Sequence, residues 1–128
     1  MFLVFVVTSA LTGAGRAQAD DRALMVEANF ARLAEQMRAR NLPLMLLISH
    51  ADCPYCNRLK TELLNPMLLS GEYGYRVMMR EIVTDVDRMV FDFQGKRLSV
   101  VEFAGRFHAW VAPTLLFLDA AGSELSPR

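Results

Sequence analysis

The feature that most constrains this chain is its only two cysteines, Cys53 and Cys56, which stand three positions apart directly after an apolar run. The run, residues 44–48, predicts a buried strand, and residues 58–64 predict a helix with leucines on one face. The pair therefore falls where a strand ends and a helix begins. We expect Cys53 at the exposed start of the helix and Cys56 one turn further along.

This placement has a consequence for thiol chemistry. A free thiol has a pKa of about 8.5, whereas cysteines at helix N-termini in such motifs have pKa values of roughly 3.5–7.5. The helix dipole and the unpaired N–H groups of the first turn favour the charged sulfur. Pro54 suits this turn, because proline is favoured at the first helical position. We expect Cys53 to attack as a thiolate and Cys56 to close the disulfide and release the partner.

Three other roles would also use a pair of cysteines at this spacing. A zinc site normally needs four ligands, and only His50 and His108 are comparably soft partners. A c-type haem needs histidine directly after the second cysteine, and Asn57 there excludes it. A purely structural disulfide is a third alternative, but in the chain-entropy model a bridge that closes so small a loop stabilises the fold least. Zinc and a structural bridge stay open, although we predict no metal and no organic cofactor.

The N-terminus predicts export. Residues 2–11 form an apolar stretch that is too short for a membrane span of about 20 residues, and Ala17-Gln18-Ala19 matches a cleavage site. No Lys or Arg precedes the stretch, which is unusual for a signal peptide. We expect a signal peptide over 1–19, cleaved after Ala19, and one domain over 20–128 in the periplasm or otherwise exported. An uncleaved N-terminal anchor is the alternative.

Composition narrows the choice of partners. The chain has 14 Lys and Arg against 14 Asp and Glu, and no basic face that would suggest nucleic acid. Two cysteines behind an export signal fit an oxidising compartment, where disulfides persist. After cleavage we expect no stable membrane span.

Hydrophobic periodicity predicts further helices and strands. The predicted elements are a helix over about 22–40, a strand over 76–85, a helix over 99–110 and a strand over 114–118. The first helix would be capped by Asp20 or Asp21. We expect the helix after the cysteines to end at Asn65-Pro66, because a residue before proline is disfavoured in helical geometry.

The order of these elements resembles the thioredoxin superfamily. Cys53-Pro54-Tyr55-Cys56 at the strand-to-helix junction is one match. The other is Val111-Ala112-Pro113-Thr114 and the apolar residues after it, which is similar to the family's cis-proline segment. The resemblance implies an α/β, thioredoxin-like three-layer fold with a mixed central sheet flanked by helices. Among subfamilies, the chain looks most like the exported bacterial thioredoxin-like proteins.

The resemblance also implies roles. It makes Cys53 and Cys56 the catalytic pair of a thiol–disulfide oxidoreductase acting on protein thiols and disulfides, with an upstream redox partner. Ala112 and Pro113 would bind an extended substrate segment, with a cis bond between them, which X–Pro bonds make accessible. Pro54 and Tyr55, a dipeptide also common in glutaredoxins, would modulate the pair.

The chain departs from the family pattern in three ways. Asp52 replaces the usual Trp before the first cysteine, and its charge would oppose a thiolate. Leu47 stands where many thioredoxins carry a buried acid, so proton transfer from Cys56 would need water, His50 or Glu81. The family's terminal helix is missing, so the domain is predicted to be incomplete at its C-terminus. The alternative function is therefore a non-catalytic or degraded thioredoxin-like binding module, with or without a metal.

Overall fold

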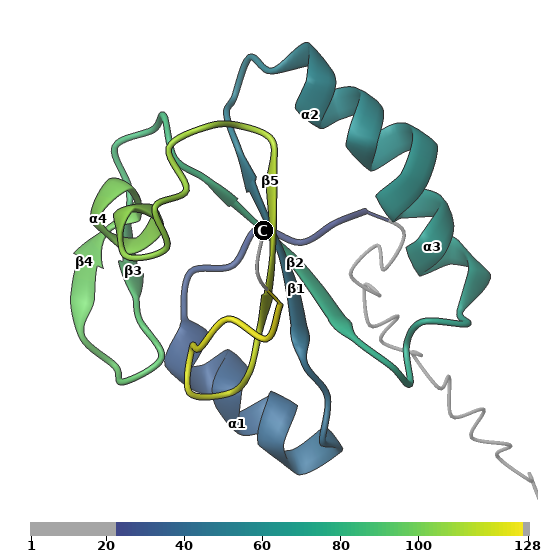
Figure 1. Ribbon diagram of the computed structural model, residues 1–128, viewed down its shortest axis with the longest axis horizontal. Helices are drawn as coiled ribbons and strands as arrows, with labels where there is room; N and C mark the ends of the chain where they lie inside the picture. The colour runs from purple at the N-terminus through teal and green to yellow at the C-terminus, as the bar shows by residue number, and fades with distance from the viewer. Residues whose placement is uncertain (1–22, 127–128) are drawn as a thin grey trace, which may run out of the picture.

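A computed structural model describes residues 23–126; the predicted signal peptide and its cleavage site lie outside this range. At the centre lies a three-stranded sheet in the order β2-β1-β5. β1 (Leu44–Ser49) pairs in parallel with β2 (Met78–Val83) and antiparallel with β5 (Thr114–Leu118). Helices cover both faces of the sheet (Figure 1). The fold is thus the mixed α/β, three-layer arrangement that the sequence predicts.

Single bridges extend the sheet on both sides. Val26 forms a parallel bridge with Glu81 beyond β2, and Glu124 forms an antiparallel bridge with Leu118 beyond β5. Between β5 and residue 126 the described chain contains no helix.

Side-chain alternation along β1 divides the core into two clusters, because successive residues of a strand point to opposite faces. Leu44, Leu46 and Ile48 belong to the larger cluster, which α1 (Phe30–Arg40) helps to form. Leu47 belongs to the smaller cluster on the opposite face, and Met45 packs against it. β1 is therefore covered on both sides, and it leads directly to the cysteines.

Helix α1 begins later than the sequence predicts. The helix expected from about residue 22 is wrong before Phe30, because the preceding residues are extended and bond to β2. Glu27 N–H donates to the Glu81 carbonyl at 2.8 Å, and Glu81 N–H donates to the Met25 carbonyl at 2.8 Å. The cap is Asn29, whose side chain accepts the N–H of Arg32. Asp20 and Asp21, the predicted caps, lie outside the described residues.

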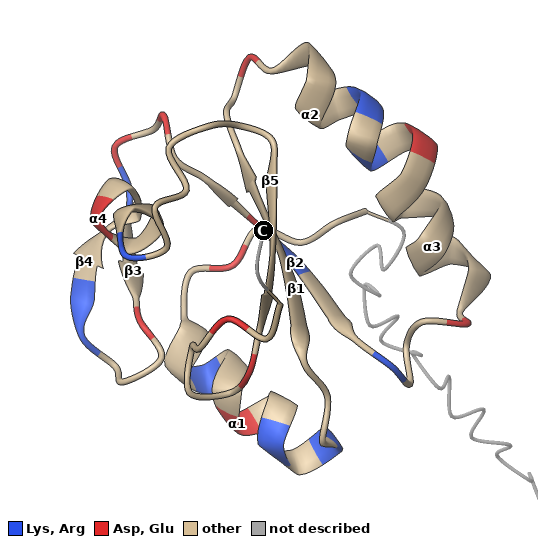
Figure 2. Ribbon diagram, viewed as in Figure 1, with Lys and Arg blue, Asp and Glu red and all other residues tan. Residues whose placement is uncertain are grey.

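The C-terminal end of α1 is stabilised by a left-handed cap residue and by basic side chains in the last turn. Asn41 adopts the left-handed conformation and donates its N–H back to the last turn. Arg38 and Arg40 occupy that turn. Figure 2 shows the basic segments of α1 in blue. Cations there complement the negative end of the helix dipole.

The helix after the cysteines runs through the predicted boundary at Asn65-Pro66, so that prediction is wrong. Three segments follow one another without a break: α2 (Pro54–Leu59), a π-helical turn η1 (Lys60–Leu64) and α3 (Asn65–Ser70). In the π turn, Asn65 N–H bonds to the Lys60 carbonyl five residues back. This wider turn admits Pro66, which has no N–H and would clash with a carbonyl in a regular helix interior.

A small hairpin and a short helix complete the fold. β3 (Met89–Phe91) pairs antiparallel with β4 (Arg97–Ser99), and α4 (Val100–Gly105) follows. Ser99 and Glu102 form a reciprocal capping box at the start of α4. The helix is shorter than the predicted 99–110, because the chain reverses at His108, which has a φ of 52°.

Asp92 closes the turn between β3 and β4. Its carboxylate is buried and accepts hydrogen bonds from the backbone N–H groups of Gln94 and Lys96, at 2.9 and 2.8 Å, and from Arg106 at 2.6 Å. Burial alone would raise the pKa of Asp92. The hydrogen bonds, that of Arg106 first, outweigh burial, so this pKa lies below its ordinary value.

We expect Asp92→Asn to lower the free energy of unfolding by roughly 1.5–3 kcal/mol at neutral pH, the range for hydrogen bonds to charged groups. A depressed carboxyl pKa stabilises the fold above the unfolded-state pKa, and this contribution is lost as pH falls through the folded-state pKa. The gap between wild type and variant should therefore shrink from about pH 5 to about pH 2. Urea unfolding of both proteins at several pH values measures this difference in the free energy of unfolding.

The control is Asp87→Asn, because Asp87 is exposed and no described residue bonds to its side chain. A gap between wild type and Asp92→Asn that stays constant over the acidic range would contradict the assignment.

Candidate functional site

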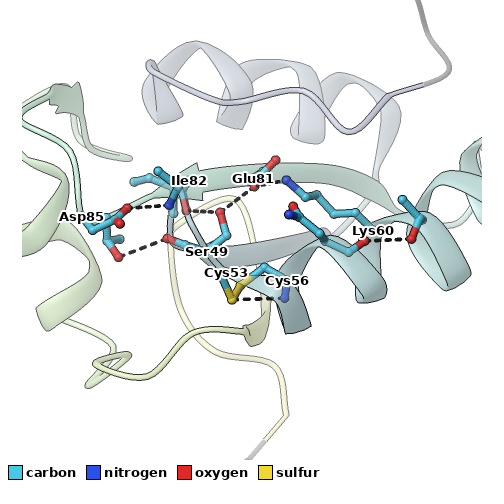
Figure 3. Close-up of polar contacts among 11 residues, drawn as sticks. Ser49, Cys53, Cys56, Lys60, Glu81, Ile82 and Asp85 are labelled. Carbon is cyan, nitrogen blue, oxygen red and sulfur yellow. Dashed lines mark hydrogen bonds and ion pairs between the residues drawn. A yellow bond between two sulfur atoms is a disulfide. The ribbon is translucent and has the colours of Figure 1, made fainter.

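The two cysteines lie where the sequence places them, and they are joined by a disulfide. Cys53 is the N-cap residue of α2, and Pro54 occupies the first turn. The Cys56 N–H donates to Cys53 Sγ at 3.1 Å (Figure 3). Cys53 is 8% exposed, whereas Cys56 is 0% exposed. Both cysteines are therefore buried, but Cys53 keeps a small exposed fraction and its sulfur accepts a first-turn N–H group, whereas Cys56 is fully enclosed.

Two segments hold the loop that carries the cysteines. Thr84 donates its N–H to the Ser49 carbonyl at 3.0 Å, directly beyond the ends of β1 and β2. Asp85 accepts the N–H of Ala51 at 2.7 Å. Asp52, the residue before Cys53, is exposed to solvent.

The predicted substrate segment comes next to this loop. The Ala112–Pro113 peptide bond is cis, and Pro113 directly precedes β5. Thr114 pairs with Ile48 in the sheet, so one further step of the same register brings Pro113 level with Ser49. No described residue bonds to the backbone N–H or carbonyl of Ala112.

Exposed apolar side chains come from both sides of the pair. Tyr55 lies between the cysteines in sequence and is 71% exposed, and Trp110 and Val111 precede the cis bond with exposures of 63% and 72%. A cavity of about 150 Å³ is lined by Trp110, by His50 and by residues of the neighbouring elements. Trp110 also covers Gly105, where an added Cβ would approach its ring to 2.5 Å.

A buried polar cluster lies on the sheet face that the cysteine helix covers. Ser49 Oγ donates to Glu81 Oε1 at 2.5 Å, and Lys60 Nζ pairs with the same oxygen at 2.9 Å (Figure 3). The sequence offered Glu81 only as one of three candidates for proton transfer, and it missed Ser49 and Lys60. Two signals pointed to this cluster: an acid inside an apolar strand, and a lysine one helical turn after Cys56.

The described residues contain no group of three or more His, Cys, Asp or Glu side chains arranged to hold a metal ion. None of the helices between residues 23 and 126 combines the length and apolar character of a membrane span.

Comparison with known proteins agrees with this geometry. The family model described as a thioredoxin-like domain matches residues 30–127. Among solved structures, the chain is similar to the crystal structure of thioredoxin O2 from Arabidopsis thaliana in its oxidised state, with a TM-score of 0.51 and 19% sequence identity. That match covers 82% of this chain and 80% of the other, and at such low identity it shows the fold alone. A search of curated proteins finds no significant match. The family model spans most of the chain, its cysteine pair and the segment before β5, so this protein belongs to the thioredoxin-like domain family.

Proposed function

We propose that this protein is an exported thiol–disulfide oxidoreductase that exchanges disulfides with protein partners through Cys53 and Cys56. The observation that carries the proposal is the difference between the two sulfurs. Cys53 Sγ accepts a first-turn N–H and the residue keeps 8% of its surface exposed, while Cys56 is 0% exposed. Such a helix N-terminus stabilises a thiolate, and the thiolate is the nucleophile of disulfide exchange.

In this reaction the Cys53 thiolate attacks a partner disulfide and forms a mixed disulfide. Cys56 then attacks Cys53 Sγ, which releases the partner as a thiol and leaves the Cys53–Cys56 disulfide. The reverse sequence oxidises a partner dithiol. The reduction potential relative to the upstream redox partner decides the direction.

The partner would bind along the segment before β5. The unbonded backbone of Ala112 is available to an extended chain, which is how a peptide adds to a sheet edge. Tyr55, Trp110 and Val111 offer apolar contacts around it. In this assignment Pro54 and Tyr55 modulate the cysteine pair.

Export is part of the proposal and is supported by the sequence. Residues 2–11 are apolar, Ala17-Gln18-Ala19 fits signal cleavage, and two cysteines in a disulfide suit an oxidising compartment such as the periplasm. Mass spectrometry of the protein secreted from its host would test cleavage after Ala19.

Alkylation of the reduced protein tests the assignment of the cysteines. We expect Cys53 to react with iodoacetamide below about pH 7 and Cys56 to stay protected, because Cys53 is the less buried of the two and its sulfur accepts a helix N-terminal N–H that would favour a thiolate. Mass spectrometry of the alkylated peptides distinguishes the two sites. In denaturant both cysteines should react alike. Equal, slow alkylation of both in the folded protein, only above about pH 8, would instead favour a non-catalytic binding module.

A further inference from the structure

The cavity of about 150 Å³ beside Trp110 is formed by the cysteine loop and by the residues that lead to the cis proline. Three parts of the chain that are distant in sequence line it: the loop after β1 with His50, the loop after β2 with Asp85, and α4 with the residues that follow it. An engineered protein cavity of about this volume binds benzene. The cavity therefore has room for one side chain of a partner.

The wall of this cavity is mostly uncharged. Ala104 and Ala109 are 2% and 4% exposed, and Val101 keeps 51% of its surface exposed. Among the described residues that line the cavity, Asp85 is the only acid and His50 is the only other titratable group. Neither lysine nor arginine is among these described residues. The cavity thus combines a small apolar surface with a single negative charge.

The Asp85 carboxylate uses one oxygen to hold the cysteine loop. Its Oδ1 accepts the Ala51 N–H at 2.7 Å (Figure 3). No described residue donates to Oδ2, and the residue is exposed. An ionised carboxylate can accept several hydrogen bonds on its two oxygens. The carboxylate is therefore fixed by the loop while one oxygen remains available to a cation.

Trp110 contributes an aromatic surface to the same cavity. Its benzo ring lies against α4, where a Cβ added at Gly105 would approach Cη2 to 2.5 Å. The residue is nevertheless 63% exposed, so much of the indole is open to a ligand. Indole attracts cations more strongly than the other aromatic side chains do. The long stems of lysine and arginine also pack well on apolar surface.

The basic side chains of this region line a different cavity. Lys60 and Arg88 line the neighbouring cavity of about 320 Å³ together with Glu81, and Lys60 is paired with that carboxylate. Neither lines the cavity beside Trp110. An anionic side chain would therefore meet Asp85 there without a compensating lysine or arginine. A cationic side chain would find complementary charge.

We propose that the cavity beside Trp110 receives a lysine or arginine side chain of the partner, with its cationic group between the Asp85 carboxylate and the Trp110 ring. This rests on the proposed function, in which the partner binds along Ala112. Trp110 precedes Ala112 by two residues, a span of at most about 7 Å. An extended partner chain rises about 3.3 Å per residue, so the basic side chain would come from within about three residues of the partner cysteine.

Activated peptides test this preference. Each peptide carries one cysteine as a mixed disulfide with thionitrobenzoate, so attack by the reduced protein releases a coloured thiolate. Three series place lysine, norleucine or glutamate at each of the three positions on either side of the cysteine. At the best position, we expect lysine to raise the second-order rate constant about tenfold over norleucine, which has the same carbon stem without the charge. Glutamate should react more slowly than norleucine.

Two checks separate binding from intrinsic reactivity. Each rate constant is divided by that of the same peptide with mercaptoethanol, an uncharged thiol, which removes the effect of the neighbouring charge on the disulfide itself. The advantage of lysine over norleucine should also shrink as salt is added, because salt screens the partly exposed Asp85 charge.

Variants locate the preference in the cavity. Asp85→Asn keeps an oxygen for the Ala51 N–H but removes the charge, so it should lower the lysine-to-norleucine ratio from about tenfold to below about threefold. Trp110→Leu should lower the ratio similarly, and it decides the matter if Asp85→Asn does not fold. Asp87→Asn is the matched control, because Asp87 is exposed on the same loop and does not line the cavity. It should keep the full ratio.

The outcomes separate this inference from the proposed function. Equal rates for all peptides, or a preference for norleucine, would overturn the inference, while the released thiolate would still support disulfide exchange. An equal fall of the ratio in Asp87→Asn and Asp85→Asn would show a diffuse charge effect and would overturn it as well. If no peptide releases thiolate, the proposed function fails, and this inference fails with it.

Discussion

Cys56→Ser is expected to accumulate a covalent complex with its disulfide substrate, whereas Cys53→Ser forms none. Cys53 is the less buried of the two cysteines, at 8% exposed against 0% for Cys56, so we expect it to attack without its partner. Without Cys56 no internal thiol can then break the mixed disulfide. Both variants should lose catalytic turnover of insulin disulfides to below detection, the largest effect expected for this chain. Non-reducing gels and mass spectrometry distinguish the two variants.

The double replacement of both cysteines is the control, because it keeps the fold but offers no sulfur. Circular dichroism should show that all three variants remain folded. A covalent complex in Cys53→Ser but not in Cys56→Ser would reverse the assigned roles. Turnover that persists in either single variant would contradict the proposed function.

Phe30→Ala is expected to lower the free energy of unfolding by about 3–5 kcal/mol, the usual cost of removing a fully buried phenylalanine. Phe30 is 0% exposed and stacks on Phe103, with ring centroids 4.2 Å apart, and it also contacts Phe93 at 5.3 Å. These rings join α1, α4 and the turn after β3. Domains of this kind are stable by only about 5–15 kcal/mol, so the variant should be close to unfolding.

Urea unfolding followed by fluorescence measures this loss. Phe91→Ala is the matched control, because Phe91 is 42% exposed and should cost far less. The cysteine chemistry of the folded fraction should be unchanged in both variants, since Phe30, Phe93 and Phe103 belong to the larger core cluster, and the cysteine helix packs on the smaller one. Similar losses for Phe30→Ala and Phe91→Ala would contradict the packing described here.

The parts of the fold that depend on local patterns could be predicted from the sequence. The strand at 114–118 and the cysteines at the start of a helix are local patterns, and the structure agrees with both. The helix predicted from residue 22 was wrong because Val26 happens to continue the spacing of Phe30, Leu33 and Met37, while its backbone pairs with β2. Hydrophobic periodicity cannot show that this segment pairs with β2 instead of forming a helix, because β2 is distant in sequence.

The predicted end at Asn65-Pro66 failed for a different reason. Proline disfavours a regular helix at the residue before it, but a single π turn relieves the clash. No local sequence pattern predicts that turn. The cluster of Ser49, Lys60 and Glu81 likewise could not be predicted from local sequence patterns. Its members meet only because β1 and β2 pair in one register and the helix crosses that face.

The position of β1 has a consequence for how the protein meets its partners. Side chains pack against this strand from above and below, so it has no room to bend or slide when the bond at its end is made or broken. Any rearrangement accompanying electron transfer should then be confined to residues 50–56. We therefore expect a partner that distinguishes the oxidised from the reduced form to do so through contacts with that short segment.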